Sequence, residues 1–338
     1  MIGKAAAAPA GRNVFFDFAP ALAYESAAVG QPGAAFDFPA QSRPTMAPTE
    51  TKLSAAEADA ATLARIRQTI DELDAEMHRS LIERGMAIGT LIKVKGTSRP
   101  GAAFRPGREA DMMRRLVARH EGALPLWTVE HIWREIITTF TRMQAPFDVA
   151  VDQGVARDAI RDTARFLFGF TVALHGQPDA SATINHIRES GTDLGLVSVD
   201  QPAEAGAWWR ALGRSTGPRI MALSPYIRIA GRPADHASFV IAPELADPTP
   251  PDLELFAVTT ISGDPRPAIA AAGGVVLAEA GQEKLIALPQ GTAMASLAAR
   301  AGFEDVAPVG ALSRGIAIGE TGADPVLYQR LDEAGVSS

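Results

Sequence analysis

The chain has 338 residues, a length that predicts two or three domains. Its 32 basic and 39 acidic side chains give a net charge of −7, which argues against a protein built mainly to hold nucleic-acid phosphate. The absence of cysteine excludes disulfides, thiolate metal sites and a cysteine nucleophile. Hydrophobic residues make up 47 %, enough for a packed core, yet no apolar run is long enough for a transmembrane helix. We therefore expect a cytoplasmic protein that binds neither nucleic acid nor membrane.

The charge is unevenly distributed along the chain. Residues 1–53 are neutral overall, residues 54–145 carry a net +2, and residues 146–338 carry a net −9. The middle segment is the cationic part of an acidic protein, and it is where we expect a small anionic molecule to bind.

Residues 1–53 are rich in alanine, proline and glycine and show no lasting helical or strand period. This composition predicts a disordered extension. A signal peptide is less favoured, because Pro9 interrupts the only alanine run and polar residues follow it.

Residues 54–145 are predicted to form an all-α domain, which begins with one long helix. Ser54 and Glu57 fit a capping box, and no proline occurs from there to residue 99. A helix to about residue 95 would be ~60 Å long and could not bury its apolar stripe on itself, so it needs other helices or a second copy of the chain. The stripe consists of Leu63, Ile66, Ile70, Leu73, Met77, Leu81, Ile88, Leu91 and Ile92.

Two shorter helices are predicted to complete this domain. Pro106 suits the first turn of a helix over about 106–120. A third helix is predicted over about 128–144, because Pro146 stops it.

Residues 146–338 alternate between strand-like and helical segments, which predicts an α/β or α+β domain. Predicted strands are 169–174, 194–199, 219–223, 237–242, 253–260, 274–277 and 284–288, and predicted helices are 180–189, 203–211 and 292–301.

Basic residues interrupt or flank the stripe of the long helix. Arg84 and Lys95 share a face, whereas Arg67 lies ~25 Å away along the axis. One small ligand could touch both Arg67 and Arg84 only if an antiparallel second copy supplied its own Arg67. The simpler alternative for each residue is a solvated cation paired with an acid one helical turn away.

Six motifs within residues 63–144 resemble the all-helical type of chorismate mutase in order and spacing. They are Leu63–Asp74, Ile82–Arg84, Ile92–Lys95, Phe104–Glu109, Trp133–Ile137 and Gln144. The resemblance covers about a quarter of the chain. It implies a three-helix domain in an interlaced homodimer that converts chorismate to prephenate by a Claisen rearrangement, in phenylalanine and tyrosine biosynthesis, without metal or cofactor.

The resemblance also implies roles for eight residues. Arg84 and the partner subunit's Arg67 would hold the two carboxylates of the substrate, and guanidinium forks suit this task. Lys95 and Gln144 would face the ether oxygen, and Glu109 would accept a hydrogen bond from the ring hydroxyl. Arg105 would contribute through its backbone, while Arg108 and Phe140 would line the pocket.

Three positions bear on these roles. Phe140 replaces a small polar residue of many relatives, which predicts a tighter pocket, and Arg105 stands where some relatives carry Asp. Gln144 stands in place of a glutamate, and a neutral donor predicts turnover that is nearly flat across neutral pH.

The last region resembles prephenate dehydratase, which many bacteria fuse to this mutase domain. Asp193–Glu204 is similar to a segment of that enzyme, and Gly217–Ile220 falls where its Thr-Arg-Phe signature stands. Pro218 takes the place of the catalytic threonine and has no hydroxyl, so we expect a dehydratase-derived domain that has lost its reaction. Residues 237–318 resemble an ACT-type regulatory module. The alternative is an unrelated α/β domain.

Two other functions remain open at this point. One is a bifunctional chorismate mutase–prephenate dehydratase, against which Pro218 argues. The other is a non-catalytic ligand-sensing or dimerisation module. The six histidines show no metal-binding spacing, so solvated or core histidines are the better interpretation.

Overall fold

The computed structural model describes residues 55–95, 103–213, 217–245, 249–261, 263–319 and 321–332. The predicted disordered extension and the capping residue Ser54 lie outside these ranges. The chain divides into two compact units, Met1–Ile66 and Arg67–Ser338. The second unit contains the rest of the long helix, two further helices and the α/β domain.

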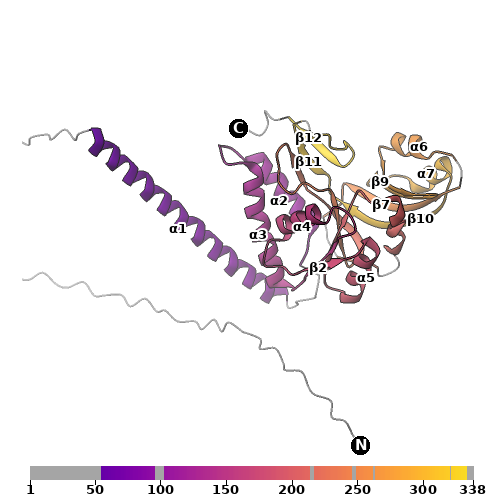
Figure 1. Cartoon of the computed structure of the whole chain (residues 1–338), viewed down its shortest axis with the longest axis horizontal. Helices are drawn as coiled ribbons and strands as arrows, with labels where there is room; N and C mark the ends of the chain where they lie inside the picture. Colours follow the sequence, from indigo (N-terminus) through magenta and orange to yellow (C-terminus); the bar gives the residue numbers. More distant parts are fainter. Residues whose placement is uncertain are drawn as a thin grey trace, which may run out of the picture. The chain divides into compact units, whose positions relative to one another are not determined.

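Three helices open the described chain, as predicted (Figure 1). They are α1 (Ala55–Lys95), α2 (Pro106–Arg119) and α3 (Leu126–Gln144). Pro106 occupies the first turn of α2, where its missing N–H costs nothing. The third helix begins two residues before the predicted start, directly after Pro125.

The apolar stripe of α1 is largely exposed. Six of its side chains have between 40 and 59 % of their surface exposed: Leu63, Ile66, Ile70, Leu73, Met77 and Leu81. The C-terminal part of the stripe, Ile88 and Leu91, is half-buried against the other helices. An uncovered row of this kind is the signature of a surface that binds another protein.

The α/β domain begins with a parallel arrangement of strands and helices. β1 (Val149–Asp152), β2 (Leu174–Gln177) and β3 (Leu194–Ser198) pair in the order β2-β1-β3. The crossover helices α4 (Arg157–Phe168) and α5 (Ala180–Ser190) pack on opposite faces of this sheet. Antiparallel β6 (Ser238–Ala242) continues the sheet, followed by β4 (Arg219–Ser224).

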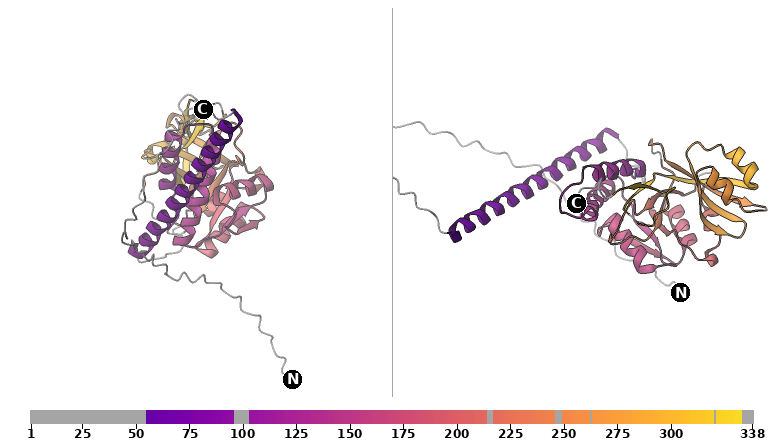
Figure 2. Two further views of the ribbon diagram at one scale, coloured as in Figure 1. Left: turned by 90° about the vertical axis from the view of Figure 1, so that its left-hand side faces the viewer. Right: turned by 90° about the horizontal axis from the view of Figure 1, so that it is seen from above.

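The second half of the same sheet has the ferredoxin-like order βαββαβ. It comprises β7 (Leu253–Thr260), α6 (Arg266–Ala271), β8 (Val275–Ala280), β9 (Glu283–Pro289), α7 (Met294–Ala301) and β10 (Phe303–Leu312), with strand order β10-β7-β9-β8. Helices α6 and α7 cover one face of it, at the orange and yellow end in Figure 2.

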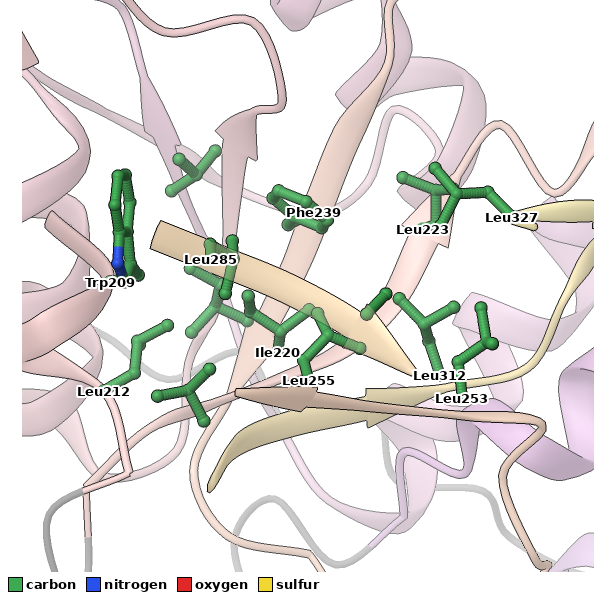
Figure 3. Close-up of a cluster of buried hydrophobic side chains, with 14 of the residues drawn as sticks. Trp209, Leu212, Ile220, Leu223, Phe239, Leu253, Leu255, Leu285, Leu312 and Leu327 are labelled. Carbon is green, nitrogen blue, oxygen red and sulfur yellow. The ribbon is translucent and has the colours of Figure 1, made fainter. Parts of the chain in front are cut away.

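The two halves join where β10 runs parallel to β4. Gly310 pairs with Ile220 there, and a Cβ atom on Gly310 would lie 2.3 Å from the Ile220 carbonyl oxygen. Only glycine permits this approach. The large apolar cluster in Figure 3 spans the junction, with Trp209 and Phe239 beside Leu255 and Leu285.

A second sheet, with parallel strands, packs against the helical domain. Its strands are β5 (Ile227–Ile229), β11 (Gly315–Ile318) and β12 (Tyr328–Leu331). Ile227, Ile316 and Ile318 pack against Met113 and Leu116 of α2. The helical and α/β domains therefore share a core within the unit Arg67–Ser338.

Two sequence-based expectations were wrong. The segment 203–211 forms two short 3-10 turns, η1 (Ala203–Ala205) and η2 (Trp208–Ala211), because Gly206 between them has a positive φ of 61°. Only the last residue of the strand predicted at 169–174 belongs to β2, since the extended pairing with β1 starts at Leu174.

Candidate functional site

A cavity of about 100 Å³ lies between α1, α2 and α3. Six of the eight predicted site residues line it: Arg84, Arg105, Arg108, Glu109, Phe140 and Gln144. Apolar side chains complete the wall, among them Ile88, Leu91, Met112 and Ile137. The cavity thus combines a charged rim with an apolar body, which is typical of small-molecule sites.

Each of the three helices contributes a different part of the site. Arg84 lies on α1 one turn before the half-buried end of the stripe. Arg105, Arg108 and Glu109 lie at the start of α2, where Pro106 sets the helix N-terminus. The last turns of α3 supply the remaining residues, Phe140 and Gln144.

Arg84 lies at the cavity and forms no ion pair with any acidic side chain that the structure describes. Its guanidinium lies over the Phe140 ring, 4.6 Å from the centroid, and its buried Nη1 has no hydrogen-bond partner within the described ranges. Burial, and then the positive charge of Arg108, lower the pKa of Arg84 from its usual value. A buried N–H without a partner costs free energy, and an anionic ligand would relieve that cost.

The other charges around the cavity strengthen this preference. Arg105 is half-buried, and its Nε likewise lacks a partner in the described part of the chain. The acidic member of the wall, Glu109, accepts a hydrogen bond at Oε2 from Nη1 of Arg134 at 2.9 Å. Because Arg134 balances the charge of Glu109, the arginines that line the cavity give it a positive potential. The lining therefore favours a ligand with negative charge.

Gln144 is anchored to its own helix. Its Nε2 donates to the Phe140 carbonyl oxygen at 3.0 Å. A primary amide has two N–H donors, so this bond leaves the amide able to donate to a ligand as well.

The structure does not bring Arg67 into this group, and it does not test the placement of Lys95. Arg67 is exposed on α1 and does not line the cavity, which follows from its distance along one straight helix. Lys95 is the last residue of α1, and its side chain lies outside what the structure describes.

Sequence reasoning missed Arg134 and Thr141. Both are buried on α3, together with Glu130 and Thr138, whereas the apolar Ile132 of the same helix is 39 % exposed. The signal was present in the sequence, since these four polar residues recur at steps of 4, 4 and 3, which is one face of a helix.

The described residues contain neither a cluster of metal-binding side chains nor a helix that could span a membrane. No group of three or more histidine, aspartate or glutamate side chains among them could hold a metal ion. None of the helices that the structure describes is long and apolar enough to cross a membrane.

Comparison with known proteins shows that the helical segment is similar to one family. Residues 66–145 match the family model of chorismate mutase type II. A bifunctional chorismate mutase/prephenate dehydratase from Neisseria gonorrhoeae is 34 % identical over 84 residues, which are 25 % of this chain and 22 % of that protein. The chain thus matches only about a fifth of the length of this curated relative.

Two solved structures resemble the chain at 11 % identity. One is described as GqqA, a novel type of quorum quenching acylase, with a TM-score of 0.30 over 49 % of this chain and 95 % of that one. The other is prephenate dehydratase from Streptococcus mutans, with a TM-score of 0.28 over 50 % and 100 %. Both scores are low, and neither likeness carries a conclusion about this chain.

Proposed function

We propose that the helical domain is a cytoplasmic chorismate mutase that converts chorismate to prephenate. The observation that carries the proposal is the half-buried Arg84, whose buried Nη1 has no hydrogen-bond partner among the described residues, in a cationic cavity formed by the segment that matches the chorismate mutase type II model. Its substrate is a small dianion, the class of ligand that this lining favours.

The chemistry fits a site without nucleophile or cofactor. In the rearrangement one C–O bond breaks and one C–C bond forms within a single molecule, so no group leaves and no proton is transferred. The protein needs only to hold the dianion in a compact chair and to stabilise negative charge on the ether oxygen. Arg84 binds one carboxylate, Lys95 and Gln144 donate to the ether oxygen, Glu109 accepts from the ring hydroxyl, and Arg105 and Arg108 add positive potential.

The direct test is the loss of chorismate absorbance when the purified full chain is added. Identification of prephenate as the product by NMR completes it. Binding of chorismate without turnover would instead support the ligand-sensing module, and neither binding nor turnover would refute the proposal.

We expect turnover to be nearly flat from about pH 5 to pH 8. The reason is that the proposed donor at the ether oxygen is the neutral amide of Gln144, which does not titrate. The measurement is kcat/KM for chorismate across this range. A steep fall toward pH 8 would contradict the role assigned to Gln144.

The functional unit proposed here is a homodimer in which each site uses Arg67 of the partner subunit. Two observations support it: the exposed apolar stripe of α1, and the position of Arg67 on the same helix as Arg84 but away from its cavity. The exposed stripe residues are already about half covered, so burying the rest of each against a second copy would contribute roughly half of the ~1.5–3 kcal/mol expected for full burial.

Complementation between two inactive variants tests this arrangement. Arg67→Ala and Arg84→Ala are each expected to be inactive as homodimers, because every site lacks one guanidinium. A heterodimer has one site with both arginines, so an equal mixture refolded together should recover about a quarter of the wild-type activity. If Arg67 served its own subunit, every site would keep one lesion and the mixture would stay inactive.

For the α/β domain we propose a dehydratase-derived fold without dehydratase activity. Pro218 is buried at the position of the threonine, and the following Arg219 faces Glu244 at 3.7 Å and donates to the Pro308 carbonyl oxygen. The test is incubation of the full chain with prephenate. Formation of phenylpyruvate would favour the bifunctional enzyme.

A further inference from the structure

Arg134 lies behind the wall of the proposed active site. It is 5 % exposed, it does not line the 100 Å³ cavity, and its Nη1 lies 2.9 Å from Oε2 of Glu109. Glu109 and Thr141 line that cavity and also a second, smaller cavity of about 40 Å³, which Arg134 does line. Glu109 and Thr141 therefore belong to the wall between the two cavities, and Arg134 reaches Glu109 from the side of the smaller one.

The far side of Arg134 is enclosed by the α/β domain. Ser224, Tyr226 and Val240 line the small cavity with it. Burial raises the pKa of Tyr226 to about 12, although the charges of Arg114 and Arg134 oppose that shift, so at neutral pH the phenol is uncharged and does not compete with Glu109 for the guanidinium. Arg134 Nε has no hydrogen-bond partner among the described residues. The Glu109 carboxylate is thus the charged group that fixes Arg134 in place.

A buried, charge-assisted hydrogen bond constrains both partners. It favours the ionised form of the carboxylate and restricts its side chain to one geometry. A Glu109 held in this way can accept a hydrogen bond from a substrate hydroxyl without reorganising first, and pre-organisation of this kind lowers the cost of reaching the transition state.

We propose that Arg134 is a positioning residue for the mutase reaction. It acts through Glu109, which it holds ionised and oriented, and it does not touch the substrate. This inference rests on the proposed function, because it gives Glu109 a substrate hydroxyl to accept from. It also makes the site depend on the α/β domain, which encloses Arg134.

The test compares Arg134→Met, Arg134→Lys and Glu109→Gln in the full chain. We expect Arg134→Met to divide its loss of activity between KM and kcat in the same proportion as Glu109→Gln does. The acid limb of its kcat/KM profile should move to higher pH, because the carboxylate has lost its neighbouring cation. Arg134→Lys retains the charge and should restore most of the activity.

Arg142→Met is the matched control. Arg142 lies on the same helix, half-buried, and binds the Phe147 and Thr171 carbonyl oxygens and Asp148 rather than Glu109. Its loss should lower the melting temperature without moving the pH profile, which separates positioning from simple support of the fold.

Combining Arg134→Met with Glu109→Gln completes the design. In the Glu109→Gln background Arg134→Met should have little further effect on kcat/KM. A wild-type pH profile in Arg134→Met, or an undiminished additional loss in the double variant, would overturn the positioning role alone. A wild-type chain without turnover would overturn the proposed function and this inference together.

Discussion

Arg84→Ala is expected to lower kcat/KM for chorismate by roughly 30-fold to 4,000-fold, the largest loss of activity that we expect from one substitution. Removing one partner of a buried, hydrogen-bonded charge pair costs about 2–5 kcal/mol, and each 1.4 kcal/mol corresponds to a factor of ten. In Arg84→Ala, one carboxylate of the bound substrate would lose the guanidinium that pairs with it. The measurement is steady-state turnover with single-turnover kinetics to separate binding from chemistry.

The stability of Arg84→Ala should move in the opposite direction from its activity. In the ligand-free chain Arg84 Nη1 is buried without a partner in the described ranges, and both burial and Arg108 lower the pKa of the guanidinium. Its charge is therefore a cost to the free protein, and its removal should leave the melting temperature unchanged or higher. Residues kept for function at the expense of stability behave in this way.

Arg79→Ala is the matched control on the same helix. Arg79 is exposed and pairs with Glu76 at 3.7 Å, an exposed pair that contributes little. It should retain wild-type turnover. If Arg84→Ala kept full activity, or lost it together with its fold, the assignment of Arg84 to the substrate carboxylate would be wrong.

The helical half of the fold was predictable because its signals are local. The stripe of α1, Pro106 and Pro146 placed all three helices within about two residues of their observed ends. Helix α4 was missed, because only Ile160, Ala164 and Phe168 form its buried apolar face among charged neighbours. The short strands β5, β11 and β12 were also missed. β5 pairs with β11 across about 90 residues, so no local pattern marks the pair, and β11 and β12 are only four residues each.

The site residues also differ in whether the sequence alone could identify them. Residues near the ends of helices, such as Arg105, Glu109 and Gln144, were predicted from the resemblance of their motifs to a known family, and the structure gathers them around one cavity. The arginine that holds Glu109 could not be assigned this way, since the two residues are 25 positions apart on different helices. Sequence spacing along one helix reports which residues share a face, but only tertiary packing decides which residue faces them.

The largest loss of stability is expected from Glu130→Gln. Glu130 of α3 and Arg232 of the α/β domain form a two-point ion pair, with distances of 3.1 and 3.0 Å and side chains that are 1 % and 3 % exposed. Removing one charge leaves the other buried and unpaired, which typically costs about 3–5 kcal/mol. Urea unfolding of the full chain measures the loss. Arg266→Met, which removes surface ion pairs with Asp264 and Glu279, should change stability by less than about 1 kcal/mol.

A double substitution tests whether the Glu130–Arg232 pair fixes the register of α3 against the α/β domain. Glu130→Leu with Arg232→Met removes both charges, and a well-packed apolar replacement is often neutral or stabilising, so the double variant should regain much of what Glu130→Gln loses. Arg232 also donates to the Pro233 and Ala234 carbonyl oxygens and lies over the Phe166 ring at 4.1 Å, so some loss should persist. The same helix carries Arg134 one turn further on, and beyond it Phe140 and Gln144. If the pair fixes the register of α3 against the α/β domain, the double variant will be stable yet less active; full activity with restored stability would show that apolar packing alone sets that register.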